Sequence, residues 1–286
     1  MQIIRSVKEM QQLMLELGKE NRIGFVATMG YFHEGHISLM KESVKENDKT
    51  VTSIFVNPLQ FGANEDLERY PQDLENDKRV AEEVGVDILF IPEATDMYPT
   101  KMTFEIIAKQ RTNVMCGKTR PGHFEGVATV LIKLFNIVRP DRTYFGSKDA
   151  QQASIVQAFI HELNFPIELV ILPIVRETDG LAKSSRNINL TTQERQEAVW
   201  IHKSLEYGRQ FVVDGEFIPA MIVQEVINMI HEKTSGTVDY VELLSYPELE
   251  PVINTGNQFI LAAAVHFSQA RLIDNLIIDS EGNKTR

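Results

Sequence analysis

Two histidines that stand three residues apart, His33 and His36, lie in a turn with glycines at Gly30 and Gly35. The apolar run Ile23–Thr28 precedes the turn, and a stretch with helical periodicity follows it. A strand, a glycine-containing turn and a helix together form an anion site, because the helix N-terminus offers N–H groups and a partial positive charge. Imidazole N–H groups at such a site can stabilise the charge that builds up during phosphate transfer. The motif therefore predicts a site for a triphosphate.

The same His-x-x-His spacing is also compatible with a metal pair. A metal site normally needs a third ligand and carboxylates that orient the imidazoles. The position of His33 and His36 in a glycine-flanked turn between a strand and a helix favours phosphate over metal.

Two further segments combine small residues with cations. The segment 145–149 contains Gly146 and Lys148 and again follows a strand pattern and precedes a helix pattern. The segment 183–187 places two serines between Lys183 and Arg186, which is a pattern that can wrap a triphosphate or pyrophosphate. An ordinary solvated turn and a solvated basic loop are the alternatives for these two segments.

Neutral amide side chains mark a possible pocket for a small polar substrate. Asn57 and Gln60 lie among aromatic residues at the end of the second strand pattern, and Gln152 begins the helix after Lys148. Amides can hold hydroxyl or carboxylate groups without carrying charge themselves. The alternative for the segment 55–62 is a turn whose phenylalanines only cover the core.

The elements that must position these residues alternate between strand and helix. Strand, helix and strand within a short stretch form a right-handed βαβ unit, so we expect a Rossmann-like doubly wound parallel α/β sheet with ligands at the carboxyl ends of its strands. The expected strands are residues 23–28, 50–56, 86–91, 143–145 and 167–175, and the expected helices are residues 36–47, 74–84, 124–138 and 150–163.

The pattern changes after about residue 176. Helices are expected near 192–213 and 218–233, followed by strands at 238–244, 258–267 and 271–278. Helices followed by adjacent strands indicate a smaller α+β domain. We therefore expect a nucleotide-binding domain with the substrate pocket at residues 1–176 and a C-terminal lid domain at residues 177–286.

Composition narrows the possible functions. The 286 residues carry 29 Lys and Arg against 40 Asp and Glu, which gives a net charge of −11 and argues against a nucleic-acid partner. The single cysteine, Cys116, allows no internal disulfide and favours a reducing compartment, so a cytoplasmic location is expected. No apolar run is long enough to span a membrane, which takes about 20 residues.

Taken together, these segments resemble the pantothenate synthetase family, also called pantoate–β-alanine ligases, within the His-x-Gly-His nucleotidylyltransferase-like superfamily. The resemblance covers most of the chain. It rests on ordered blocks at residues 28–36, 55–61, 120–135, 140–152, 174–187 and 270–275.

The resemblance implies an ATP-dependent ligase. ATP would adenylate the carboxylate of pantoate and release pyrophosphate, and β-alanine would then attack the pantoyl-adenylate to give pantothenate and AMP. A homodimer is implied as well. Mg²⁺ would accompany the phosphates, and Asp77 is the candidate carboxylate ligand.

The same resemblance assigns roles to individual residues. The catalytic candidates are His33, His36, Lys148 and Arg186. The candidates for ATP binding are Met29, Gly30, His33, His36, Gly146, Ser147, Lys148, Asp149, Val175, Lys183, Ser184, Ser185 and Arg186. The candidates for pantoate and β-alanine binding are Asn57, Gln60 and Gln152.

The sequence departs from the family pattern at three positions. Ala27 replaces a proline that usually precedes the Thr-Met-Gly turn, Phe32 replaces leucine, and Gln72 stands where arginine is frequent. Proline stiffens a turn by fixing φ, so Ala27 is expected to loosen the ATP loop without removing a ligand.

Three other functions remain compatible with the histidine motif. One is a nucleotidylyltransferase that leaves AMP on its product, and the paired amides and long second domain argue against it. The second is a nucleotide sensor without an acid pocket. The third is a tRNA-aminoacylating enzyme, which the acidic chain disfavours.

Overall fold

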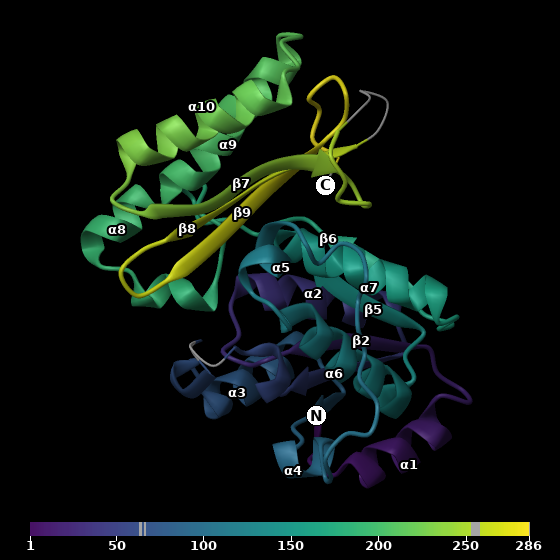
Figure 1. Ribbon diagram of the computed structural model, residues 1–286. Helices are drawn as coiled ribbons and strands as arrows, with labels where there is room; N and C mark the ends of the chain where they lie inside the picture. The colour runs from purple at the N-terminus through teal and green to yellow at the C-terminus, as the bar shows by residue number, and fades with distance from the viewer. Residues whose placement is uncertain (63–64, 66, 253–257, 286) are drawn as a thin grey trace. The chain divides into compact units, whose positions relative to one another are not determined.

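The computed structural model describes residues 1–62, 65, 67–252 and 258–285. The chain divides into two compact units (Figure 1), each of which is described separately. The first unit contains Met1–Lys109, Arg120–Gly146 and Ile155–Leu172, and the second contains Gln110–Thr119, Ser147–Ser154 and Pro173–Arg286. Two short segments that precede residue 155, Gln110–Thr119 and Ser147–Ser154, therefore belong to the second unit.

The first unit is built on a six-stranded parallel sheet. Its strands are β1 (Gln2–Ile4), β2 (Ile23–Thr28), β3 (Lys49–Ile54), β4 (Ile88–Phe90), β5 (Arg142–Gly146) and β6 (Glu168–Leu172). The helices of this unit are α1 (Val7–Leu17), α2 (Glu34–Glu46), α3 (Leu74–Val84), α4 (Ala94–Met97) and α6 (His123–Val138), with short 3-10 turns η1 (Pro58–Gln60) and η2 (Leu67–Arg69). Helix α7 (Ala150–Glu162) belongs to this unit from Ile155 onward, and its first residues belong to the second unit.

The strand order β1-β4-β3-β2-β5-β6 explains where the site residues gather. Strand β2 lies between β3 and β5, and the chain leaves β2 toward β3 on one side while β5 and β6 continue on the other. The order thus reverses between β2 and β5. Ligands of open α/β sheets bind beyond the carboxyl ends of the strands at such a reversal.

Apolar side chains cover both faces of this sheet. Phe25 and Val51 belong to a core cluster that includes residues of α1, α6 and α7. Val26 and Leu89 belong to a second cluster with residues of α2 and α3. Because successive side chains of a strand point to opposite faces, a parallel sheet with two covered faces requires continuous apolar strands. The sequence of β2, buried at almost every position, meets that requirement.

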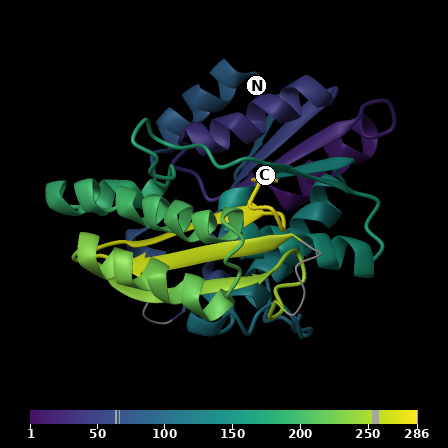
Figure 2. The same cartoon turned by 90° about the horizontal axis from the view of Figure 1, so that it is seen from above.

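The second unit has a three-stranded antiparallel sheet in the order β7-β8-β9. Its strands are β7 (Thr237–Ser245), β8 (Phe259–His266) and β9 (Arg271–Ile278), and its helices are α5 (Met115–Thr119), α8 (Thr192–Glu197), α9 (Val199–Val213) and α10 (Pro219–Lys233). Two 3-10 turns, η3 (Ser147–Asp149) and η4 (Ser185–Asn189), complete it. Helices α9 and α10 run along one face of the sheet (Figures 1 and 2) and bury a separate apolar core against it.

The expected fold class is confirmed: the chain has a parallel doubly wound sheet and a smaller C-terminal α+β part. Strand β2 has the expected bounds. Strand β1 and helix α1 were not expected; β1 is a three-residue edge strand that pairs only with β4. The functional division into a domain at 1–176 and a lid at 177–286 stays a prediction.

Candidate active site

The turn after β2 is held in an unusual backbone conformation. Gly30 has φ +86° and Tyr31 has φ +54°, which is the left-handed region that glycine adopts readily and other residues adopt at a cost. Thr28 pins the start of the turn, since its Oγ1 donates to the carbonyl of Ser53 at 2.6 Å and accepts the N–H of Gly30 at 3.1 Å. The loop is therefore fixed directly at the carboxyl end of the strand.

A buried carboxylate holds the other side of this turn. The Asp77 oxygens accept the backbone N–H groups of Tyr31 at 2.8 Å and Phe32 at 2.7 Å, and Asp77 is 1% exposed. Burial raises its pKa above the usual range, while the two N–H bonds act in the opposite direction. A Cβ on Gly30 would come within 2.9 Å of Asp77 Oδ2. The side chain thus fits closely around the turn.

This geometry argues against the expectation that Asp77 is a magnesium ligand. Each of its oxygens already accepts a backbone N–H group, and the side chain is almost wholly buried. Among the described residues, no group of three or more His, Cys, Asp or Glu side chains could hold a metal ion. Asp77 fixes the loop in this structure, and its role as a magnesium ligand stays a prediction.

The two histidine rings are in contact at the start of α2, with centroids 4.1 Å apart and ring planes tilted by 34°. Nδ1 of His33 accepts the N–H of Gly35 at 3.1 Å, and Nδ1 of His36 accepts the N–H of His33 at 3.4 Å. A ring nitrogen that accepts a hydrogen bond is unprotonated, so the proton of each neutral imidazole lies on Nε2. The capping arrangement therefore turns both rings into Nε2–H donors.

Gly35 makes this arrangement possible. A Cβ at this position would lie 2.8 Å from Cε1 and 2.9 Å from Nδ1 of His33. Contacts this short do not occur for real Cβ atoms, so any larger residue displaces the His33 ring. The glycine is required for close approach and not only for helix entry.

Asn57 is 1% exposed and makes hydrogen bonds with both ends of its amide. Its Oδ1 accepts the N–H of Leu59 at 3.3 Å and the hydroxyl of Tyr98 at 2.8 Å. Its Nδ2 donates to the carbonyl of Gly126 and to Oε1 of Gln60, both at 3.1 Å. With its donors and acceptors occupied within the chain, Asn57 holds Gln60 in place, and a contact of Asn57 with substrate stays a prediction.

Gln60 lies between the amide cluster and the histidine turn. Its Nε2 is 3.0 Å from Sδ of Met29, which precedes Gly30. Its carbonyl accepts from Nδ1 of His123 at 2.8 Å, and Nε2 of that ring lies 3.1 Å from Arg120. The side chain and backbone of Gln60 are thus both held in place.

Arg120 is occupied by a carboxylate. Its Nε donates to Oε1 of Glu65 at 2.7 Å and its Nη2 donates to Oε2 at 2.5 Å, which is a bidentate pairing of the guanidinium with the carboxylate. Burial would raise the pKa of Glu65, but the bonds from Arg120 overcome this and leave that pKa below its usual range. Arg120 therefore serves the local network around His123 and not an open anion site.

In the second unit, the turn η3 carries the candidates Ser147, Lys148 and Asp149. Ser147 is 2% exposed, and its Oγ has no hydrogen-bond partner within the described part of the chain. The next helix position, Gln151, donates to the carbonyls of Arg111 and Val114 at 2.7 and 2.8 Å. Gln151 is consequently a structural residue, whereas Gln152 is partly exposed.

The other cationic segment of the second unit follows a small hairpin. The N–H of Lys183 donates to the carbonyl of Val175 at 2.9 Å, and the Lys183 ammonium pairs with Glu177 at 2.9 Å. Ser184 caps η4 by accepting the N–H of Arg186 at 3.3 Å, and Ser185 is 6% exposed. The hairpin and the cap place Lys183–Arg186 in one continuous turn.

The candidates thus fall into two groups, one in each unit. The first unit brings together Met29, Gly30, His33, His36, Asn57 and Gln60, with Gly146 at the end of β5. The second unit contains Ser147, Lys148, Asp149, Gln152, Val175, Lys183, Ser184, Ser185 and Arg186.

Several residues that shape the site had no recognisable signal in the sequence. Tyr98 reaches Asn57 across 41 positions, and Glu65 reaches Arg120 across 55. Such contacts depend on which strands are neighbours, and local spacing does not reveal this.

No helix in the described residues combines the length and hydropathy needed to cross a membrane.

Comparisons with known proteins cover nearly the whole chain. The family model described as pantoate-beta-alanine ligase matches residues 2–277. Pantothenate synthetase of Geobacillus kaustophilus (strain HTA426) is 53% identical over 97% of this chain and 93% of that protein, and pantothenate synthetase of Bacillus subtilis (strain 168) is 51% identical over 98% of each.

Solved structures give the same result. Pantothenate synthetase from Thermus thermophilus is 40% identical, has a TM-score of 0.89 and is matched over 96% of this chain and 99% of its own. Pantoate-beta-alanine ligase from Francisella tularensis, complexed with beta-gamma ATP and beta-alanine, is 33% identical with a TM-score of 0.83 and 97% coverage of each chain. The chain therefore belongs to the pantoate–β-alanine ligase family.

Proposed function

We propose that this chain joins pantoate to β-alanine with ATP, through a pantoyl-adenylate, and releases AMP and pyrophosphate. The observation that carries the proposal is the pair of imidazoles at the carboxyl end of β2, both oriented as Nε2–H donors by backbone hydrogen bonds. Family membership and the relatives named pantothenate synthetase support the substrate assignment. The related structure complexed with beta-gamma ATP and beta-alanine supports ATP and β-alanine.

In the first step, a pantoate carboxylate oxygen forms a bond to the α-phosphorus of ATP. The bond from that phosphorus to the β-phosphate oxygen breaks, and pyrophosphate leaves. Negative charge builds on the phosphate oxygens in the transition state. The Nε2–H groups of His33 and His36 are fixed donors for this charge, and such pre-organised donors lower the barrier.

In the second step, the amine of β-alanine attacks the acyl carbon of the adenylate. A C–N bond forms, the C–O bond to AMP breaks, and the attacking nitrogen releases a proton to solvent water. The first step makes this attack possible because AMP is a far better leaving group than hydroxide. The amide of Gln60 is the proposed contact to pantoate, and its side chain is held by Asn57 and Met29.

The second unit supplies the remaining proposed ATP contacts. Lys148 and Arg186 are the proposed catalytic cations, and the orphaned hydroxyl of Ser147 is a buried polar group that calls for a partner. Asp149, Val175, Lys183, Ser184 and Ser185 are the proposed neighbours of the nucleotide, and Gln152 is the second proposed pantoate amide. In this proposal the C-terminal domain acts as a lid.

Mg²⁺ that accompanies the ATP phosphates is part of the proposal, without an assigned protein ligand. Mg²⁺ usually binds through substrate phosphates and few protein carboxylates. It would supply charge neutralisation on the phosphates. Because Asp77 is occupied by backbone N–H groups, the residues present do not identify a protein ligand for it.

The decisive experiment measures products with and without the amine. With ATP and pantoate alone, mass spectrometry should detect a pantoyl-adenylate and pyrophosphate. Free AMP and pantothenate should form in equal amounts when β-alanine is added. A product that keeps AMP attached in the presence of β-alanine would instead support the nucleotidylyltransferase alternative.

We also propose a homodimer in the cytoplasm. Light scattering coupled to size exclusion should give about twice the chain mass of 32.5 kDa. A mass near that of one chain would contradict the dimer without affecting the proposed chemistry.

A further inference from the structure

Of two consecutive buried residues of β9, Asn275 contacts the turn that carries Lys148, and Asp274 contacts Arg176 in the hairpin that leads to the segment Lys183–Arg186. Each is 4% exposed, although neither carries any proposed chemistry. Buried polar side chains are costly unless their hydrogen bonds are satisfied, so their partners show what these residues do.

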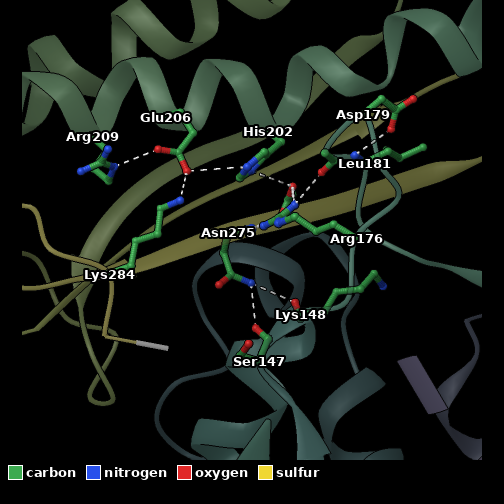
Figure 3. A network of polar contacts seen from close by, with 12 residues as sticks. Ser147, Lys148, Arg176, Asp179, Leu181, His202, Glu206, Arg209, Asn275 and Lys284 are labelled. Atoms are coloured by element: carbon green, nitrogen blue, oxygen red, sulfur yellow. Dashed lines mark hydrogen bonds and ion pairs between the residues drawn. The ribbon is translucent and has the colours of Figure 1, made fainter. Parts of the chain in front are cut away.

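Asn275 holds the turn that carries Lys148. Its Nδ2 donates to the carbonyls of Ser147 and Lys148, both at 3.0 Å, and Figure 3 shows the amide directed at these two residues. The two amide hydrogens thus hold two successive carbonyls of η3. This geometry fixes the peptide plane between Ser147 and Lys148 and hence the direction in which the lysine side chain leaves the backbone.

Asp274 holds the hairpin that leads to the second segment. Its carboxylate pairs in bidentate fashion with Arg176, at 2.7 and 2.9 Å. Arg176 also donates to the carbonyl of Gly180 at 3.1 Å, across the hairpin closed by the bridge between Arg176 and Ala182. Lys183 follows directly after that bridge.

The groups around Asp274 determine which cation compensates its negative charge. Nδ1 of His202 lies 3.6 Å from Oδ2 of Asp274, and Nε2 of the same ring lies 3.6 Å from Oε1 of Glu206. Burial lowers the pKa of His202, although both neighbouring carboxylates act to raise it. Glu206 is itself paired with Arg209 at 2.9 Å and with Lys284 (Figure 3). Arg176 therefore remains the principal cation that compensates Asp274.

We propose that Asn275 is a positioning residue for Lys148, and that Asp274, through Arg176, positions the segment Lys183–Arg186. Two neighbouring positions on one strand thereby set the spacing between the two cationic segments that would contact the nucleotide phosphates. The inference rests on the proposed function, because it assumes that Lys148 and the segment Lys183–Arg186 act on ATP.

The test is a double-mutant cycle between Asn275→Ala and Lys148→Ala, measured by steady-state kinetics with ATP, pantoate and β-alanine varied in turn. Asn275→Ala should raise the KM for ATP and lower kcat, because a misplacement of about 1 Å can cost roughly 10²-fold in rate. The KM for pantoate should stay near the wild-type value. In the Lys148→Ala background, the same substitution should change kcat/KM for ATP by less than about twofold, since the group that it positions is already missing.

A purely structural role predicts different results. Loss of folded protein lowers apparent kcat and leaves every KM unchanged, and its effect multiplies with that of Lys148→Ala. Either result would overturn the inference. Asn228→Ala is the matched control, because Asn228 is an exposed asparagine of the same unit whose side chain bonds only to Gln224 among the described residues; its kinetics should be unchanged.

Two further variants keep the test interpretable if Asn275→Ala folds poorly. Asn275→Ser retains one donor in a smaller side chain and should give a smaller increase in the KM for ATP, again only when Lys148 is present. Arg176→Lys removes the bidentate pairing and should raise the KM for ATP with pantoate unaffected. Unchanged ATP kinetics in both variants would overturn the inference.

The outcomes also separate this inference from the proposed function. If Lys148→Ala alone leaves the ATP kinetics unchanged, the proposed role of Lys148 is wrong. If Lys148→Ala is defective and well-folded Asn275→Ala is not, the proposed function stands and the positioning role is wrong.

Discussion

At the scale of single residues, the structure separates side chains that can act on substrate from side chains that hold them. His33 and His36 each accept a backbone N–H at Nδ1, which leaves the proton of the neutral ring on Nε2. Asn57 has the same amide group as Gln60, but its amide oxygen and nitrogen already make hydrogen bonds to other residues of the chain. Residue type alone does not distinguish these roles.

The first prediction concerns the histidine donor. His36→Ala should lower kcat by roughly 10²–10³-fold, because one pre-organised donor is typically worth that much in the transition state. The KM for pantoate should change little, since the amide pocket is intact. Steady-state kinetics measure both parameters, and His231→Ala, at an exposed position of α10, is the matched control. Wild-type turnover in His36→Ala would remove His36 from the mechanism.

The second prediction concerns the buried amide. Asn57→Ala should raise the KM for pantoate nearly as much as Gln60→Ala does, because Gln60 loses the donor that holds its Oε1. It should also lower the free energy of unfolding by about 1–3 kcal/mol, because the carbonyl of Gly126 loses a buried donor. Kinetics and urea unfolding measure the two effects.

The double variant distinguishes positioning from direct binding. If Asn57 acts through Gln60, the combined effect on the KM for pantoate should be clearly smaller than the product of the two single effects. Full multiplication of the two effects would show that Asn57 contacts the substrate independently.

At the scale of elements, helix termini and nearby loops depend on carboxylates that accept backbone N–H groups. Asp77 of α3 holds the turn between β2 and α2, and Glu194 closes the capping box of α8 with Thr191. Glu194 also accepts the N–H of Ser268 at 2.7 Å, so it ties α8 to the turn between β8 and β9. Both carboxylates have pKa values that depart from the usual range, but in opposite directions.

For Asp77, the third prediction follows from a pKa raised mainly by burial. A carboxyl with a higher pKa in the folded state binds its proton more tightly there, so its contribution to stability falls as pH rises from the unfolded value through the folded one. The stability of the wild type relative to Asp77→Asn should therefore be greater at pH 4 than at pH 7. Urea unfolding at both pH values measures it, and the opposite slope would contradict the assignment.

The same variant has a functional consequence. Asparagine offers only one acceptor oxygen, so one of the N–H groups of Tyr31 and Phe32 faces a donor. We expect a lower turnover in Asp77→Asn even where the protein is fully folded, because the histidine turn shifts.

For Glu194, the fourth prediction has the opposite sign. Backbone hydrogen bonds from Thr191 and Ser268 lower the pKa of Glu194 to about 2. Its stabilising contribution is therefore full above the unfolded pKa of about 4.3 and is lost as pH falls toward 2. The difference in melting temperature between the wild type and Glu194→Gln should shrink between pH 5 and pH 2. A constant difference would show that the ionised carboxylate is not the stabilising form.

At the scale of the whole molecule, two compact units each have their own apolar core, and the candidate residues are divided between them. The proposed ligase assigns nucleotide contacts to both units. Binding of ATP should accordingly stabilise the folded chain as a whole.

The fifth prediction tests this linkage. ATP at a concentration about 100 times its Kd should raise the free energy of unfolding by about 2.7 kcal/mol and raise the melting temperature. Lys148→Ala should show a smaller rise at the same ATP concentration, because it binds ATP less tightly. Differential scanning fluorimetry measures the shift. An ATP-independent melting temperature in the wild type would contradict the proposed ATP site.

Much of the fold could be predicted from the sequence because the parallel sheet leaves a strong local pattern. Strand β2 is apolar along its length, and the helical periodicity of α3 and α6 is clear, so these elements were located closely. Strand β1 has only three residues and is partly exposed, so its membership of the sheet depends on β4, which lies far along the chain.

The candidate site could be predicted less completely. The histidine turn and both cationic segments are contiguous motifs, and the sequence therefore identifies them as candidates. The roles of Asp77 and Asn57 depend on partners tens of residues away. The sequence alone does not distinguish an aspartate that accepts backbone N–H groups from one that binds a metal ion. Burial and hydrogen-bond direction are properties of the assembled fold.

Gly35 has no functional group, yet it determines which ring nitrogen of the neutral His33 imidazole carries the proton. A methyl group at this position would push the neighbouring ring away from the amide that keeps Nδ1 bare, and the imidazole would then be free to exchange tautomers. Acid–base behaviour in this enzyme can consequently drift through a substitution that leaves every reactive side chain unaltered. In homologues or engineered variants with altered pH optima, the residue that corresponds to Gly35 should be inspected first.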